Sequence, residues 1–158
     1  MDSFLFQGKY IPKLIYRGSV DGTKKDEFMS KVSARAPTLH ILRSDKDKVF
    51  GAYISVTLGT EKNSWEDDSE AFIFSVSNKT KHIQYRNRGF AVYRNKSTIL
   101  LCMGYESPGN GFDLCIHQSY NFGNSNSSLG QTYALPPGVH ANTEQAKEYL
   151  AGASKFSI

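Results

Sequence analysis

The sequence has few of the features that would place it outside the class of ordinary globular domains. Its 158 residues include two cysteines, five prolines and one tryptophan. The longest purely apolar run, Ile99–Met103, is far shorter than the roughly 20 residues that cross a bilayer, so we expect no membrane insertion. The start, at residues 1–8, has neither a basic nor a sustained apolar region. It does not resemble a secretory signal, and we expect a cytoplasmic protein.

Motifs for metals and cofactors are also missing. Cys102 and Cys115 lie far apart in apolar segments, which favours buried, reduced thiols over a disulfide or a metal knuckle. The sequence leaves open whether either thiol is redox-active. It contains no phosphate-binding glycine loop, no dinucleotide fingerprint and no nucleophile elbow. The four histidines are scattered without ligand spacing. We therefore predict no cofactor and no metal.

Short apolar segments are what the sequence has in abundance, with aromatic residues making up 13% of the chain. Turn-forming residues separate them, which is typical of antiparallel strands. The candidate strands are residues 13–16, 38–43, 49–56, 71–76, 83–85, 90–93, 98–103, 112–117 and 131–135, with a further one opening at 156. Helices are predicted over residues 23–34 and 142–150. The lack of regular strand–helix alternation favours a sandwich or a barrel over a parallel sheet. We assign residues 1–12 to an N-terminal extension and 13–158 to a single domain.

Charge is distributed unevenly although the net charge is only +4. No acidic residue occurs between Glu70 and Glu106. The cations in this gap are Lys79, Lys81, Arg86, Arg88, Arg94 and Lys96. Aromatic residues alternate with them, a mixture that can hold phosphates while rings stack on bases. A half-buried strand with its rings turned inward produces the same mixture, so both interpretations stay open.

Carboxylates crowd together just before this basic segment. They are Glu66, Asp67, Asp68 and Glu70. Crowded carboxylates can raise one another's pKa and serve as an acid/base pair, but a solvated acidic loop is the simpler interpretation. Asp113 stands apart, because it precedes an apolar run and a buried carboxylate needs partners. We interpret it as a turn or edge residue that accepts backbone hydrogen bonds.

Several segments, in order along the chain, resemble the TLDc family, the domain of eukaryotic oxidation-resistance proteins. They are residues 14–22, 49–55 with a Phe-Gly pair, 69–75 with an acidic entry to a Phe-x-Phe strand, 111–116 with an Asp-Leu pair, and 150–156. Their polar motif positions are Asp21, Glu70 and Asp113. Relatives continue with an acidic-hydrophobic strand beyond the position of Ile158.

The resemblance implies a fold and a role. The implied fold is mainly β (α+β), a two-layer antiparallel β-sandwich flanked by two short helices. The implied role is protection against oxidative stress through protein partners, notably the vacuolar proton-pumping ATPase, with no catalytic residue assigned. On this interpretation Glu66, Asp67 and Asp68 form an acidic docking loop.

Two other functions remain open. The first is a DNA-binding transcriptional regulator of the oxidative-stress response, nuclear under stress, in which the six cations from Lys79 to Lys96 contact nucleic acid. The second is an enzyme that uses Glu70 or Asp113 as its acid, which would require a pocket and a perturbed carboxylate. We favour the nonenzymatic interaction domain.

Overall fold

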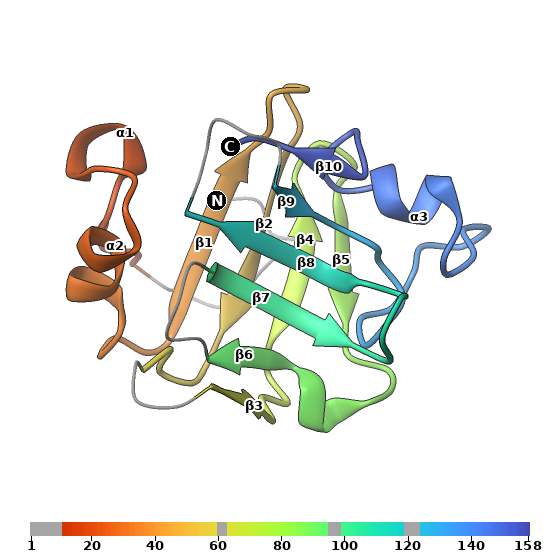
Figure 1. The fold of residues 1–158 in the computed structure, drawn as a ribbon, viewed down its shortest axis with the longest axis horizontal. Coiled ribbons are helices and arrows are strands. Elements are labelled where there is room, and N and C mark those ends of the chain that lie inside the picture. The colour runs from red at the N-terminus through yellow and green to blue at the C-terminus, as the bar shows by residue number, and fades with distance from the viewer. Residues whose placement is uncertain (1–10, 60–62, 95–98, 119–123) are drawn as a thin grey trace.

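Two antiparallel sheets, one packed on the other, make up most of the molecule (Figure 1). The computed structural model describes residues 11–59, 63–94, 99–118 and 124–158. The four-stranded sheet has the order β1-β2-β4-β5, with β1 (Thr38–Arg43), β2 (Val49–Ile54), β4 (Phe72–Ser75) and β5 (Thr80–Ile83). Every pairing within it is antiparallel. The predicted mainly β fold with antiparallel sheets is confirmed.

The second sheet is six-stranded, with the order β10-β9-β8-β7-β6-β3. Its strands are β3 (Ser64–Glu66), β6 (Val92–Arg94), β7 (Ile99–Tyr105), β8 (Phe112–His117), β9 (Ser125–Asn126) and β10 (Lys155–Phe156). In Figure 1 the long strands of the two sheets cross at a steep angle. The β7–β8 pair is central to this sheet, and the short strands β3 and β10 form its edges.

The hydrophobic core lies between the sheets, where both contribute fully buried side chains. Phe50 of β2 packs edge-on against Phe156 of β10, with ring centroids 5.5 Å apart. Ile73 on β4 and Met103 and Leu114 on β7 and β8 are likewise 0% exposed. Alternation along each strand turns such residues inward, and apolar burial of this kind is the main stabilising contribution to the fold. Removing a buried phenylalanine ring costs about 3–5 kcal/mol.

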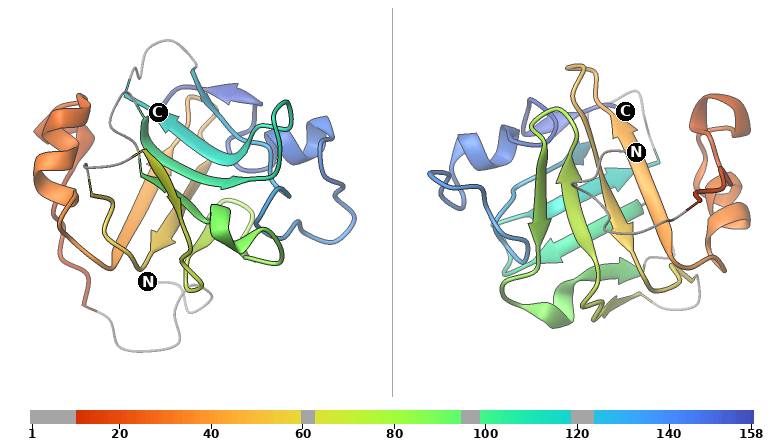
Figure 2. Two further views of the ribbon diagram at one scale, coloured as in Figure 1. Left: turned by 60° about the horizontal axis from the view of Figure 1, so that its bottom comes forward. Right: turned by 180° about the vertical axis from the view of Figure 1, so that it is seen from behind.

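The helices are short and lie outside the sheets (Figure 2). They are α1 (Gly18–Asp21), α2 (Lys25–Val32), α3 (Glu144–Glu148) and the single 3-10 turn η1 (Arg88–Phe90). Helix α2 confirms the amphipathic helix expected over 23–34, and it buries Phe28, Met29 and Val32. Helix α3 confirms the second predicted helix. Its cap is Thr143, whose Oγ1 accepts from the Ala146 N–H at 3.3 Å.

Several predicted elements differ from the structure. Residues 13–16 are not a strand; Tyr16 instead packs on Phe28 of α2, with ring centroids 5.1 Å apart, and no neighbouring strand pairs with this segment within the described chain. The strand predicted over 131–135 is reduced to one bridge between Gln84 and Tyr133. Strands β3 and β9 and helix α1 were not predicted, because two to four residues carry too little periodic pattern.

The described part of the chain contains no helix with the length and apolar character needed to cross a bilayer. The division at residue 12 remains a prediction, because residues 1–10 lie outside the described chain.

Candidate functional site

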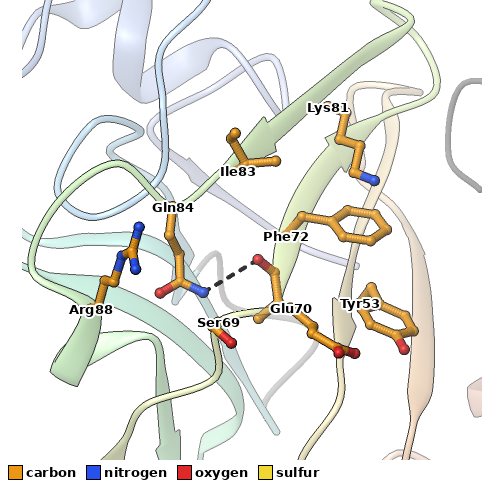
Figure 3. Close-up of a pocket in the computed structure, with 9 residues that line it drawn as sticks. Tyr53, Ser69, Glu70, Phe72, Lys81, Ile83, Gln84 and Arg88 are labelled. Carbon is orange, nitrogen blue, oxygen red and sulfur yellow. Dashed lines mark hydrogen bonds between the residues drawn. The ribbon is translucent and has the colours of Figure 1, made fainter.

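A groove of about 460 Å³ lies on the surface beside β4 and β5 (Figure 3). Its lining residues come from β2, from β4 and the connection that enters it, and from β5 and the segment after it. They are Tyr53, Ser69, Glu70, Ala71, Phe72, Lys81, Ile83, Gln84 and Arg88. The groove therefore depends on how three strands of the four-stranded sheet are aligned.

Strand register builds the floor of the groove. Tyr53 of β2 pairs with Phe72 of β4, and Phe72 pairs with Ile83 of β5. Directly paired residues of antiparallel strands point to the same face, so these three side chains form a row across the sheet. The Tyr53 and Phe72 rings stack with centroids 5.1 Å apart and planes 15° from parallel. Lys81 Nζ lies 3.9 Å from the centroid of the Phe72 ring, a cation–π contact.

Both signs of charge border this aromatic floor. Glu70 and Arg88 are exposed, and so is Lys81. Figure 3 shows Lys81 and Tyr53 on either side of Phe72, with Arg88 beyond Gln84 at the far side of the groove. Stacked rings beside arginine and carboxylate groups form a surface suited to a partner with both apolar and charged side chains.

Hydrogen bonds hold the segment that carries Glu70 in place. Asp68 is buried, and its Oδ2 accepts from the Ser55 N–H at 2.7 Å. From β5's end, the Gln84 amide donates to the carbonyl oxygen of Asp68 and, at 3.4 Å, to that of Ala71. The second bond is the dashed line in Figure 3. These hydrogen bonds connect the rim of the groove to the segments that follow β2 and β5.

A second buried carboxylate, Asp113 of β8, fixes a different segment. Oδ1 accepts the N–H groups of Gly130 and Gln131 at 2.6 and 2.9 Å. Oδ2 accepts those of Thr132 and Tyr133 at 2.6 and 3.2 Å. Burial raises the pKa of Asp113 to about 7, against the four N–H donors, which lower it. Asp113 therefore has a structural environment, as expected, although it lies within a central strand.

Comparison with models of protein families identifies the family of this chain. A model of the TLDc domain matches residues 2–158, essentially the whole chain. The chain belongs to the TLDc domain family. This family is linked with the oxidative-stress response, and its domains are interaction domains. No curated protein matches the chain.

The polar residues at TLDc motif positions have different surroundings in the structure. Asp21 accepts from the Arg17 N–H at 2.6 Å and pairs with Lys31 Nζ at 2.7 Å, so it joins α1 to α2. The hydrogen bond from Lys31 is the main reason that the pKa of Asp21 is lowered. Asp113 is fully buried. Of the three motif residues, Glu70 is the one at the rim of the groove.

The proposed acidic docking loop of this TLDc domain is divided. Glu66 belongs to β3, where Oε1 lies 3.6 Å from an Arg94 guanidinium nitrogen. Asp68 is buried against the backbone of residues 55 and 56. Asp67 is the exposed member of this loop, and Glu70, which follows the loop, is exposed as well. Docking through these acids stays a prediction, and the exposed pair is where it can be tested.

The cations of the basic segment are likewise separated. Lys79 lies in the exposed turn before β5, and Lys81 and Arg88 border the groove. Arg86 forms an ion pair with Glu106 at 3.0 Å and donates to the Gln131 carbonyl, while Arg94 pairs with Glu66. Lys96 lies outside the described residues. Nucleic-acid binding stays a prediction. Two of these cations, Arg86 and Arg94, form ion pairs with carboxylates.

Some groove residues were not anticipated from the sequence. Tyr53 lies at an outward position on β2, and Ile83 lies at an outward position at the end of β5. Gln84 is the next residue after β5 and also lines the groove. The alternating pattern indicates which residues share a face within one strand, but the alignment of β2, β4 and β5 comes only from the pairing of the strands.

The described residues hold no group of three or more His, Cys, Asp and Glu side chains suited to a metal ion.

Proposed function

We propose that this TLDc domain is a nonenzymatic interaction module of the oxidative-stress response and that it binds a protein partner through the groove between Glu70 and Arg88. The observation that carries the proposal is the groove on one face of the four-stranded sheet, where Tyr53, Ile83 and Arg88 line the surface and the buried Phe72 ring supports Tyr53 from within the sheet. Stacked aromatic side chains with a nearby arginine are the typical anchors of protein interfaces.

Large apolar side chains are exposed on this face both in the groove and beyond it. Ile83 is 59% exposed and Ile41 of β1 is 62% exposed. Ile41 pairs with Gly51, two residues before Tyr53, so it lies on the same face of the sheet as the groove floor. Large exposed apolar residues gathered on one sheet face are a feature of binding surfaces.

For the partner we propose the vacuolar proton-pumping ATPase, on the strength of the family resemblance. A role at the pump requires the domain to be in the cytoplasm, which is our proposal for its location. The mixed charges at the rim favour a partner surface that offers a cation to Glu70 and an anion to Arg88.

Binding to purified pump subunits tests both parts of the proposal. Ile83→Asp and Arg88→Glu should each weaken binding at least about tenfold, which is about 1.4 kcal/mol. Matched controls are Val20→Asp on α1, where Val20 is 74% exposed, and Lys155→Glu on β10. Both controls should bind like the parent chain.

Two failures would have separate meanings. If the parent chain binds no pump subunit, the pump is the wrong partner. If it binds and both groove variants bind equally well, the interaction uses another surface and the groove assignment is wrong.

A further inference from the structure

The two cysteines, distant in sequence, meet in the middle of the six-stranded sheet. Cys102 of β7 and Cys115 of β8 are directly paired in the antiparallel register. Both are free thiols and both are 0% exposed. Because directly paired residues point to the same face, their Cβ atoms are expected to lie about 4.5–5.5 Å apart. A disulfide needs about 3.5–4.5 Å, so a small local adjustment of two strands is enough to close one.

His117 connects this thiol pair with the surface. It follows Cys115 by two residues in β8, so both side chains point to the same face. His117 Nε2 lies 3.5 Å from Cys115 Sγ. The imidazole is half-buried, whereas the sulfur atom it contacts is fully buried. His117 is therefore a partly exposed group in direct contact with the buried sulfur atom.

Electrostatics distinguish the two sulfur atoms. Hydrogen bonds from Cys102 and from His117 lower the pKa of Cys115 to about 6, although burial opposes them. Burial raises the pKa of Cys102 well above its usual value, and the nearby charges of Cys115 and Asp113 add to this. The contact with Cys115 raises the pKa of His117. On β9 the residue paired with Cys115 is the neutral Asn126. The hydrogen bonds and the burial therefore favour the thiolate on Cys115 and the thiol on Cys102.

We propose that Cys102 and Cys115 form a peroxide-reactive dithiol that closes to a disulfide between β7 and β8, with His117 as the positioning residue that maintains the reactive sulfur. This inference does not depend on the groove or on its partner. It assigns the domain a chemical response to hydrogen peroxide, in addition to an interaction surface.

The reaction proceeds in two balanced steps. The Cys115 thiolate attacks one peroxide oxygen and the O–O bond breaks, giving a sulfenic acid on Cys115. The departing hydroxide takes from solvent the proton that the Cys115 thiol had released, and leaves as water. Cys102 sulfur then attacks the Cys115 sulfur, the S–O bond breaks, and the hydroxyl group leaves with the Cys102 proton as a second water. Two thiols are oxidised to one disulfide and one peroxide is reduced to two waters.

The test is to treat the purified chain with hydrogen peroxide and then to identify its oxidised peptides by mass spectrometry without reduction. The expected product is one intramolecular cross-link between the peptides of Cys102 and Cys115, with the loss of two hydrogen atoms. In Cys102→Ala, a sulfenic-acid trap such as dimedone should label Cys115. In Cys115→Ala, Cys102 should remain a thiol.

His117→Gln tests the positioning role without altering a buried residue. Its rate of disulfide formation at about pH 6 should fall severalfold, because loss of the His117 contact raises the pKa of Cys115 and leaves less thiolate there, while the hydrogen bond from Cys102 remains. At about pH 9 the two rates should converge. A purely structural role would slow the reaction equally at both pH values.

Three results would overturn the proposal. They are an intermolecular disulfide as the only product, peroxide treatment that leaves both thiols reduced, and a His117→Gln rate profile that matches the parent. If the cysteine variants fail to fold, peptide mapping of the parent and the His117→Gln profile still decide the matter.

Discussion

Asp113 Oδ1 accepts the backbone N–H of Gly130 at 2.6 Å, and this contact joins a central strand to a segment 17 residues further along the chain. Three more N–H groups from residues 131–133 complete the coordination of the carboxylate. The same segment then reaches the other sheet, because the Tyr85 N–H donates to the Thr132 carbonyl at 3.0 Å and Gln84 bridges Tyr133. One buried side chain thus organises a connection between the two sheets.

Replacement of Asp113 should therefore destabilise the fold. In Asp113→Asn the amide NH₂ would face backbone donors, and at least one buried N–H would lose its acceptor. We expect the free energy of unfolding to fall by about 2–4 kcal/mol, measured by urea denaturation. Asp67→Asn, at an exposed carboxylate, is the control and should change it by less than about 0.5 kcal/mol. Equal stability of the two variants would contradict the role of Asp113.

A second prediction concerns the stability of the fold at acid pH. His82 is 2% exposed. Its Nδ1 atom lies 2.8 Å from the Ala134 carbonyl oxygen, and its Nε2 atom lies 3.0 Å from Thr80 Oγ1. Burial lowers its pKa, although the bond to Ala134 opposes this. The unfolded chain then binds a proton at higher pH than the folded chain does. The stability contributed by neutral His82 is complete above about pH 6.5 and is lost as the pH falls through the lowered pKa.

Urea denaturation from about pH 7.5 to pH 5 checks this behaviour. The parent chain should lose stability across this range faster than His82→Gln does. Asp113 contributes equally to the pH dependence of both chains, so its contribution cancels when their stabilities are subtracted. Its raised pKa has the opposite effect to that of His82 and favours the folded state as the pH falls. Parallel pH profiles for parent and variant would rule out the contribution from His82.

A third prediction explains why the Phe-Gly pair in β2 needs glycine. A Cβ atom on Gly51 would lie 1.9 Å from the His40 carbonyl oxygen and 2.6 Å from Phe74 Cζ. The backbone of β1 cannot yield without breaking its pairing with β2. Gly51→Ala should lower the free energy of unfolding by at least about 3 kcal/mol. Gly109→Ala, where nothing lies within 4 Å but φ is +97°, should cost only about 1 kcal/mol. A stable Gly51→Ala chain would show that β1 and β2 can separate locally.

A fourth prediction addresses nucleic acid. Arg86 and Arg94 form ion pairs with Glu106 and Glu66. We therefore expect duplex DNA to bind weakly, with little dependence on salt. A fluorescence-anisotropy titration at several salt concentrations measures both. Tight binding with a steep salt slope, reduced by Lys79→Ala and Arg88→Ala, would favour the DNA-binding alternative instead.

Local patterns were enough for the larger elements. The apolar spacing of Phe28, Met29 and Val32 predicts α2, and the apolar runs around residues 49–54 and 99–103 predict β2 and β7. Each depends on side chains close together in sequence. The segment at 13–16 has the same apolar character but is not a strand, since a strand requires a partner that sequence pattern alone does not supply.

The sequence by itself determined the mainly β composition, the TLDc resemblance and the chemical types available: carboxylates, a basic segment and two thiols. Only the tertiary structure decided which of them meet. Pairing of strands aligned Tyr53 with Phe72 and Cys102 with Cys115, and it enclosed Asp113 while leaving Glu70 exposed. The reason is that register depends on contacts between residues far apart along the chain, and a shift of one residue turns every side chain of a strand to the opposite face.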